Sequence, residues 1–199
     1  LEPSLRAAVA LRPDLVGFSA FTEEIADAAA LAAGIKSACP DALTVVGGYH
    51  ASALPQRTLE EFSDFDLSVS GEGEGPMSAL TSGLPYGEIA GLAWRDGNGQ
   101  IRVNPAVTRF PALDELPPPA WDLYDHAKYG FRLPVEPSRT CPFRCNFCFQ
   151  ATSETARFKS PEHIIDEIEE GVGRYGAQEI SFGSAGAFPL KRSHAMAVC

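Results

Sequence analysis

The amino-acid sequence predicts an α/β protein of two parts, of which the first is a doubly wound, Rossmann-like open sheet. In residues 1–85, short apolar runs alternate with stretches whose apolar residues recur at helical spacing. A proline-rich stretch separates this region from a second strand–helix–strand pattern. Strands that alternate with amphipathic helices are typical of parallel sheets with helices on their faces.

Apolar runs and capping residues define the elements of the first part. The three predicted strands are residues 14–19, 43–46 and 65–70. Between the first two, we expect a helix that is capped by Thr22, buries Cys39 and ends before Pro40. A helix that ends before Pro13 precedes the first strand, and residues 58–62 form another short helix.

A hairpin and a connector follow the predicted open sheet. Residues 86–108 hold a β-hairpin, because an Asp-Gly-Asn-Gly turn lies between two strand-like runs. Residues 109–134 are rich in proline and predict a stiff connector between domains. We therefore place the boundary between the two domains in this connector.

The second part, residues 135–199, begins with a βα unit. A strand over 135–140 leads into a cysteine-rich loop, and a helix capped by Ser160 follows. The expected buried stripe of this helix is Ile164, Ile165, Ile168, Val172 and Tyr175. Residues 179–182 are the second strand, so the loop lies at the carboxyl end of the first.

Composition excludes several classes of protein. The chain of 199 residues is 45% hydrophobic and 21% charged, which is not a disordered composition. Its 16 basic and 26 acidic residues give a net charge of −10, without the basic cluster expected of a nucleic-acid-binding protein. We found neither a secretory signal nor an apolar run long enough to span a membrane, so we expect a soluble, cytoplasmic protein.

Three of the five cysteines lie on one short loop. Cys141, Cys145 and Cys148 have three and then two residues between them, a poor pattern for disulfides but a suitable one for a metal centre. Soft thiolates favour zinc or iron–sulfur centres. Structural zinc takes four ligands, and the candidates for the fourth are the distant Cys199 and His163. Three ligands suit instead a four-iron cluster whose fourth iron is open to substrate.

The cysteine loop and its flanks resemble the radical S-adenosylmethionine superfamily. The resemblance covers residues 136–149, in which the aromatic Phe147 precedes the last cysteine, and continues in residues 157–168 and 179–182. It implies a partial (βα)6 barrel in which the three loop cysteines hold a [4Fe-4S] cluster. It also implies reductive cleavage of S-adenosylmethionine to methionine and a 5′-deoxyadenosyl radical. Phe147 would lie near the adenine.

The same resemblance implies that Gly183 and Ser184 contact the methionine moiety. Relatives commonly carry acidic residues just after the second strand, whereas residues 184–187 are Ser-Ala-Gly-Ala. This departure weakens any transfer of side-chain roles to that segment. A full (βα)8 barrel takes about 250 residues, so six units need roughly 190. The second part is much shorter, the chain begins at Leu1 rather than at methionine, and we expect a fragment truncated at both ends.

The first part resembles the cobalamin-binding domain that precedes many radical S-adenosylmethionine barrels. The matching segments are residues 14–21, 45–50 and 70–74. In such a sheet, ligands bind at the carboxyl edge of the strands. The residues that the resemblance places there are Ser19, Phe21, Gly47, Gly48, His50, Gly71 and Gly73. Because the chain lacks an Asp-x-His-x-x-Gly loop, we expect His50 to lie beside the cofactor or pack the turn rather than bind cobalt.

Together, the two resemblances imply a cobalamin-dependent radical S-adenosylmethionine enzyme, or a fragment of one. Such enzymes transfer methyl groups or cyclise and rearrange small-molecule substrates, as anaerobic protoporphyrin ester cyclases do. A one-electron donor such as flavodoxin or ferredoxin is the implied partner. The alternatives are a corrinoid- or zinc-binding module without catalysis, and a fragment that is inert on its own.

Overall fold

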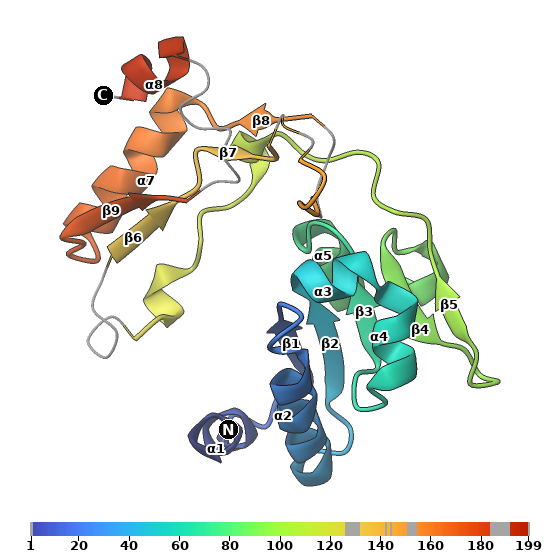
Figure 1. The fold of residues 1–199 in the computed structure, drawn as a ribbon. Coiled ribbons are helices and arrows are strands. Elements are labelled where there is room, and N and C mark those ends of the chain that lie inside the picture. Colours follow the sequence, from blue (N-terminus) through green and yellow to red (C-terminus); the bar gives the residue numbers. More distant parts are fainter. Residues whose placement is uncertain are drawn as a thin grey trace. The chain divides into compact units, whose positions relative to one another are not determined.

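The computed structural model describes residues 2–125, 132–141, 143, 145–150, 155–183 and 192–198. The chain forms two compact units, Leu1–Thr108 and Arg109–Cys199, which we describe separately (Figure 1). No helix among the described residues is long and apolar enough to cross a membrane.

The first unit is built on a five-stranded sheet in which neighbouring strands follow one another in the chain. Its strands are β1 (Leu15–Ser19), β2 (Leu43–Gly47), β3 (Leu67–Val69), β4 (Leu92–Arg95) and β5 (Ile101–Val103). Strands β1, β2 and β3 are parallel, whereas β4 is antiparallel to both β3 and β5. Ser19 pairs with Gly47, so β1 and β2 end level at the carboxyl edge.

Helices cover both faces of this sheet, as a doubly wound α/β fold requires. The helices are α1 (Glu2–Ala10), α2 (Ile25–Ala38), α3 (Gly48–Ala53), α4 (Pro55–Glu61) and α5 (Glu74–Thr81). Figure 1 shows α2, α3 and α4 in front of the sheet and α5 behind it. The short η1 turn (Tyr86–Glu88) precedes β4.

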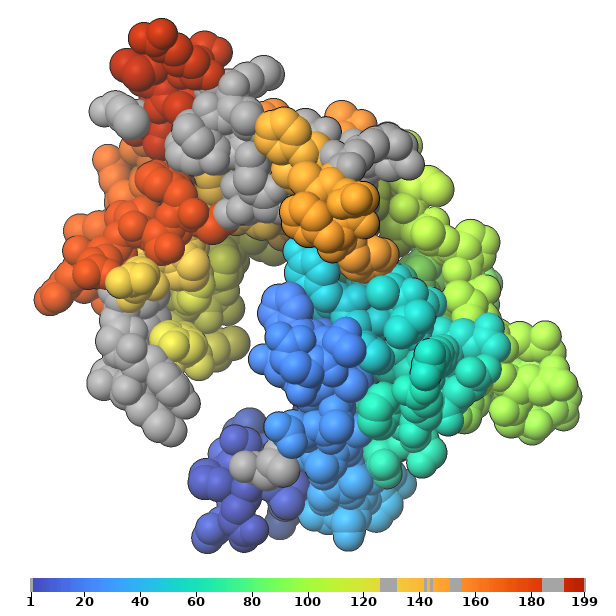
Figure 2. All heavy atoms as spheres, viewed as in Figure 1, coloured from blue at the N-terminus to red at the C-terminus, as the bar shows by residue number. Residues whose placement is uncertain are grey.

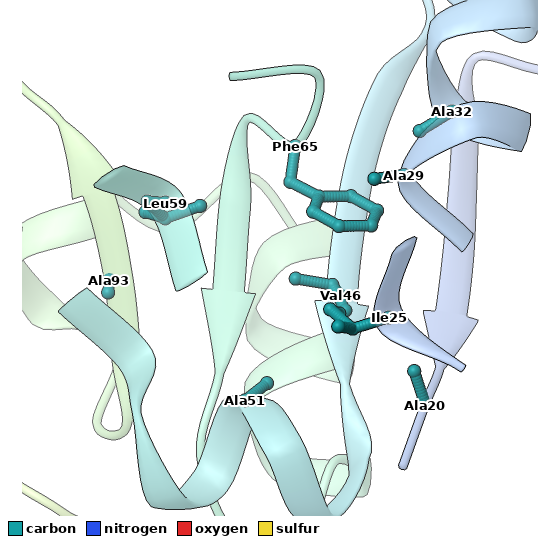
Figure 3. Packing of buried hydrophobic residues seen from close by; sticks show 9 residues of the cluster. All are labelled: Ala20, Ile25, Ala29, Ala32, Val46, Ala51, Leu59, Phe65 and Ala93. Atoms are coloured by element: carbon teal, nitrogen blue, oxygen red, sulfur yellow. The ribbon is translucent and has the colours of Figure 1, made fainter. Parts of the chain in front are cut away.

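Alternating side chains of the strands fill two separate cores. Val46 points to the face of α2, α3 and α4, where the buried Phe65 ring lies close to Ala29 (Figure 3). Its neighbour Val45 points to the opposite face and packs with Leu80 of α5. This period of two explains why continuous apolar runs correctly predicted strands that are buried on both faces.

Two expectations about helix α2 were wrong. Thr22 does not cap the helix; Glu24 occupies the N-cap position, and its carboxylate accepts a hydrogen bond from the Phe21 N–H at 3.0 Å. The Thr22 hydroxyl lies instead 3.1 Å from the Nδ1 of His50, a contact across 28 residues of chain. Cys39 is half-buried rather than buried, because the helix ends at Ala38.

The predicted hairpin is part of the first sheet. The Asp96 carboxylate accepts hydrogen bonds from the N–H groups of Asn98 and Gln100 and pairs with Arg102 at 2.7 Å. These bonds, that of Asn98 above all, hold the pKa of Asp96 below its ordinary value. On β4, the Arg95 guanidinium donates to the carbonyls of Leu59, Phe62 and Phe65, and thereby ties the end of α4 to the sheet.

The second unit contains the expected βα pattern with one difference in the first strand. Strands β6 (Arg132–Val135) and β9 (Glu179–Phe182) are parallel, and α7 (Pro161–Gly173) packs against β6. The strand predicted over 135–140 is divided, because β7 (Ser138–Arg139) leaves β6 and pairs with β8 (Arg157–Phe158). A further short helix, α8 (Arg192–Val198), contacts α7.

The N-terminus of α7 is confirmed, but its buried stripe was only partly predicted. The Ser160 hydroxyl accepts the N–H of His163 at the N-cap. Ile164 is fully buried, whereas Ile165 and Val172 are 37% and 50% exposed. The buried face continues instead through Glu167 and Gly171.

The proline-rich stretch makes specific contacts with the second unit. It contains two 3-10 turns, η2 (Leu113–Glu115) and η3 (Trp121–Leu123), and the Leu113 side chain is buried. The Asp114 carboxylate accepts the Ser160 N–H at 2.8 Å, and the Arg157 guanidinium lies 4.9 Å from the centre of the Phe110 ring. Polar and aromatic side chains between the prolines therefore anchor residues 109–125 to this unit.

Helix α7 approaches β6 so closely that Gly171 is needed at the contact. A Cβ at this position would overlap the methyl groups of Leu133, which is fully buried. We expect Gly171→Val to lower the free energy of unfolding of the second unit by about 1–3 kcal/mol, through overpacking. Gly173→Val is the matched control, because a Cβ there meets nothing within 4 Å. Denaturant unfolding measures both; equal stabilities of the two variants would contradict the expectation.

Candidate functional site

The carboxyl edge of the first unit brings together most of the residues predicted to contact cobalamin. Ser19 ends β1, Gly47 ends β2 beside it, and the loop with Gly71 and Gly73 follows β3. Helix α3 starts at Gly48, directly after β2, so the chain turns sharply at the edge. Ser19 is exposed, and parallel strands present their carboxyl ends to ligands at such an edge.

The four glycines of this edge fall into two groups. Gly48 and Gly71 have φ values of 88° and 82°, in the left-handed region, so the backbone itself requires glycine there. Gly47 is extended, and a Cβ on it would make only an ordinary contact of 3.7 Å with the Val69 carbonyl oxygen. A Cβ on Gly73 would meet nothing within 4 Å. Packing within the described chain therefore does not require glycine at 47 and 73, and the space beside Gly73 is open.

An exposed aromatic pair lies at the same edge. The rings of Phe21 and Tyr49 stack with centroids 5.2 Å apart and an interplanar angle of 14°. They are 49% and 45% exposed. Phe21 was a predicted site residue, whereas Tyr49 was not. Its position next to Gly48 was the only signal that could have indicated it.

His50 is buried beneath the edge. Its ring is 5% exposed and lies edge-on to Phe62, with centroids 6.5 Å apart. Nδ1 contacts the Thr22 hydroxyl, while Nε2 is buried and has no hydrogen-bond partner among the described residues. In this arrangement, His50 packs the turn and presents neither ring nitrogen to a ligand at the surface.

Helix α3 also positions the loop that follows β3. The Gly71 N–H donates to the Ser52 hydroxyl at 2.9 Å, and the Ser70 hydroxyl donates to the Ala51 carbonyl at 3.4 Å. These bonds hold Ser70 and Gly71 against α3, at the carboxyl edge of the sheet. Ser52 was not predicted, because its contact joins segments 19 residues apart.

In the second unit, the β7–β8 ladder closes the base of the cysteine loop. Ser138 pairs with Phe158 and Arg139 with Arg157. Thr140 then takes a φ of 74°, which is uncommon for a β-branched residue and turns the chain sharply into Cys141. The loop therefore leaves the sheet in a defined direction.

The three loop cysteines are free thiols. Cys141 is half-buried, and Cys145 and Cys148 are exposed. A turn joins the last two, because the Cys148 N–H donates to the Cys145 carbonyl at 3.0 Å. Among the described residues, no three His, Cys, Asp or Glu side chains are grouped closely enough to hold a single metal ion. The donor set is that of an iron–sulfur cluster, in which thiolates bind separate irons.

The structure describes two of the three residues predicted to contact S-adenosylmethionine, Phe147 and Gly183. Phe147 is 87% exposed, so it does not pack under the loop, and amber to orange atoms of the loop lie at the surface in Figure 2. Gly183 follows β9, and its N–H donates to the Val135 carbonyl at 2.9 Å, at the carboxyl end of β6. Ser184 lies outside the described residues, as do His126 and Cys199.

The two described histidines of the second unit lie on helices α7 and α8. His163 lies in the first turn of α7, where its N–H donates to the Ser160 hydroxyl. The Nε2 of His194 lies 2.6 Å from the Lys159 carbonyl oxygen, and its ring contacts Phe158 edge-on. The His194 ring therefore has a packing role, whereas His163 takes part in the helix cap through its backbone N–H.

Comparison with known protein families matches the two parts of the chain separately. Residues 2–81 match the B12 binding domain, and residues 135–195 match the Radical SAM superfamily. The chain belongs to the cobalamin-dependent radical S-adenosylmethionine family. Cobalamin, a [4Fe-4S] cluster and S-adenosylmethionine are the cofactors of these two domains.

Curated relatives of this family include methyltransferases and cyclases. An uncharacterized methyltransferase of Pyrococcus horikoshii is 34% identical over 180 residues, which are 85% of this chain and 39% of that protein. The anaerobic magnesium-protoporphyrin IX monomethyl ester cyclase of Rubrivivax gelatinosus is 31% identical over 80% of this chain and 31% of its own length. The chain thus spans well under half of each relative.

Solved structures of the family have the same fold. The cobalamin-dependent radical enzyme OxsB, with aqua-cobalamin and S-adenosylmethionine bound, superposes with a TM-score of 0.78 and 21% identity. This match covers all of the present chain and 30% of OxsB. The methyltransferase TsrM of Kitasatospora setae gives a TM-score of 0.72 with 22% identity, over 99% of this chain and 42% of its own.

Proposed function

We propose that this chain is the cofactor-binding part of an enzyme that uses cobalamin and a [4Fe-4S] cluster to methylate or cyclise a small molecule. The observation that carries the proposal is the loop of three free thiols, which starts from a fixed ladder at the carboxyl end of a parallel strand. The related proteins named as methyltransferases and cyclases support these two reaction types. A one-electron donor such as flavodoxin or ferredoxin would serve it in the reducing cytoplasm.

In this proposal, Cys141, Cys145 and Cys148 each bind one iron through a thiolate. The chemistry supplied there is one-electron cleavage of S-adenosylmethionine to methionine and a 5′-deoxyadenosyl radical. The N–H of Gly183 is engaged with Val135, so Gly183 offers its carbonyl and its open Cα to the methionine moiety. Phe147 is free to close over the adenine, because its ring is exposed.

The carboxyl edge of the first unit would receive cobalamin. Gly47 and Gly73 admit the nucleotide tail, the exposed Ser19 hydroxyl can hydrogen-bond it, and Phe21 offers an apolar face. Gly48 and Gly71 give the edge its backbone shape, because their positive φ values require glycine. His50 supports the turn from below and does not bind cobalt.

Anaerobic reconstitution tests this proposal directly. We expect about four iron and four sulfide ions per chain, a brown colour, and an electron paramagnetic resonance spectrum of the reduced cluster that changes when S-adenosylmethionine is added. Hydroxocobalamin should co-purify with the chain through gel filtration. A protein that takes up stoichiometric zinc but neither iron nor sulfide would be a zinc-stabilised module instead, and the proposal would fail.

A further inference from the structure

The side chain of Gln150 joins the two ends of the cysteine loop by hydrogen bonds. Gln150, two residues after Cys148, donates from Nε2 to the Cys141 carbonyl at 3.0 Å and to the Phe143 carbonyl at 2.7 Å. A side-chain amide has two N–H donors, so both are used on the loop backbone. The contacts join the two ends of the loop, across the exposed segment that carries Cys145.

The two bonds add a second closure to the loop. The β7–β8 ladder fixes its base at Ser138 and Arg139, and Gln150 fixes the segment that begins with the first cysteine. The Cys145–Cys148 turn orders the remaining two thiols. Because Gln150 follows Cys148 by two residues, its bonds to Cys141 and Phe143 set how far the first thiol lies from the last.

We propose that Gln150 is a positioning residue for the cluster: it holds the cysteine loop closed before iron arrives. The inference rests on the proposed function for the identity of the centre. A loop that is already closed loses less conformational entropy when it binds metal. Two neutral hydrogen bonds of ordinary strength correspond to about a tenfold to thirtyfold bias toward the closed loop.

The first test detects the two hydrogen bonds of Gln150 to Cys141 and Phe143, here called the clamp, in the protein without any cofactor. The chain has four glutamines, Gln56, Gln100, Gln150 and Gln178, so selective 15N-glutamine labelling gives four side-chain amide groups, each with a pair of proton signals. Gln150→Leu identifies its signal by removing it. We expect the Gln150 amide protons in the metal-free protein to exchange several-fold more slowly than those of the exposed Gln178. Equal exchange of the two amides would overturn the proposal.

The second test measures retention of the cluster. Gln150→Leu and Gln150→Glu both lack the paired donors, and we expect each to lose iron to a chelator about tenfold faster than the parent. Both should also shift the reduction potential and the paramagnetic resonance signature of the cluster, while the thermal unfolding midpoint stays unchanged. Gln178→Leu, an equivalent change at an exposed position in the same unit, serves as the control.

The outcomes separate this inference from the proposed function. If the parent binds no cluster, the proposed function fails, whereas slow exchange of the Gln150 amide still supports the clamp. If the parent binds the cluster and both Gln150 variants retain it with parental kinetics and spectra, only the positioning role fails. If a Gln150 variant unfolds, its cluster retention is not interpreted. The exchange measurement on the parent protein then decides whether the clamp exists.

Discussion

Replacement of Cys145 by alanine is expected to abolish assembly of the iron–sulfur cluster. A three-cysteine site that loses one ligand leaves one iron without a protein thiolate. We expect iron and sulfide per chain to fall by about tenfold after anaerobic reconstitution, with loss of the brown colour. Because Cys145 is exposed and has no packing role, the unfolding midpoint should stay within the error of the measurement.

Cys39→Ala is the matched control for this experiment. Cys39 is also a free thiol, but it lies at the end of α2 in the first unit. Its removal should leave the iron and sulfide content unchanged. A Cys145→Ala protein with a full complement of iron and sulfide would show that Cys145 is not a ligand, and the assignment of all three loop cysteines would then have to be revised.

Local signals in the sequence were sufficient for much of the fold. Continuous apolar runs predicted β2 and β3 because these strands are buried on both faces, and β1 because its apolar residues are half-buried against the same two cores. The Ser160-Pro161 pair predicted the start of α7 because an N-cap and its proline act within one turn of helix. Helices α3 and α5 were not predicted, since six and eight residues are too few to show a helical period.

Expectations failed where a distant contact overrides local preference. Thr22 is a good N-cap residue, but its hydroxyl contacts His50, and Glu24 takes the cap position instead. On α7, the apolar residues Ile165 and Val172 lie outside the face that packs on β6. Helical spacing predicts which residues form the apolar stripe of a helix. It does not predict which part of that stripe is buried by neighbouring elements.

The candidate sites divide in the same way. The cysteines were predictable because their spacing is itself the signal, and the glycines were predictable because they follow strands. Gln150, Tyr49 and Ser52 were missed, since each acts through a single contact that has no pattern in the sequence. The left-handed conformation of Thr140 was equally hidden, because threonine does not favour it.

The glycines at the end of β2 should respond in opposite ways to the same substitution. In Gly48→Ala, the new Cβ would lie 2.8 Å from the Ala20 nitrogen and 2.9 Å from its oxygen. Both atoms are backbone and are held by hydrogen bonds to Gly47 and His50. Together with the left-handed φ, this overlap should lower the free energy of unfolding of the first unit by about 2–4 kcal/mol.

Gly47→Ala should instead preserve the fold and weaken cobalamin binding. Its backbone is extended, so alanine adopts it without strain, and we expect stability to change by less than about 1 kcal/mol. A methyl group there would lie in ordinary contact with the carbonyl oxygens of Phe18 on β1 and Val69 on β3, where we place the nucleotide tail. Loss of that close approach should raise the Kd for cobalamin by about tenfold, or ~1.4 kcal/mol.

Denaturant unfolding and a cobalamin titration followed by visible absorbance distinguish the two positions. The pair is informative because stability and binding should change independently: Gly48→Ala loses stability first, and Gly47→Ala loses affinity alone. If Gly47→Ala bound cobalamin as tightly as the parent, the cofactor would not approach the end of β2. The glycines at the end of β2 would then serve only the turn into α3, and the cobalamin site would have to lie elsewhere on the unit.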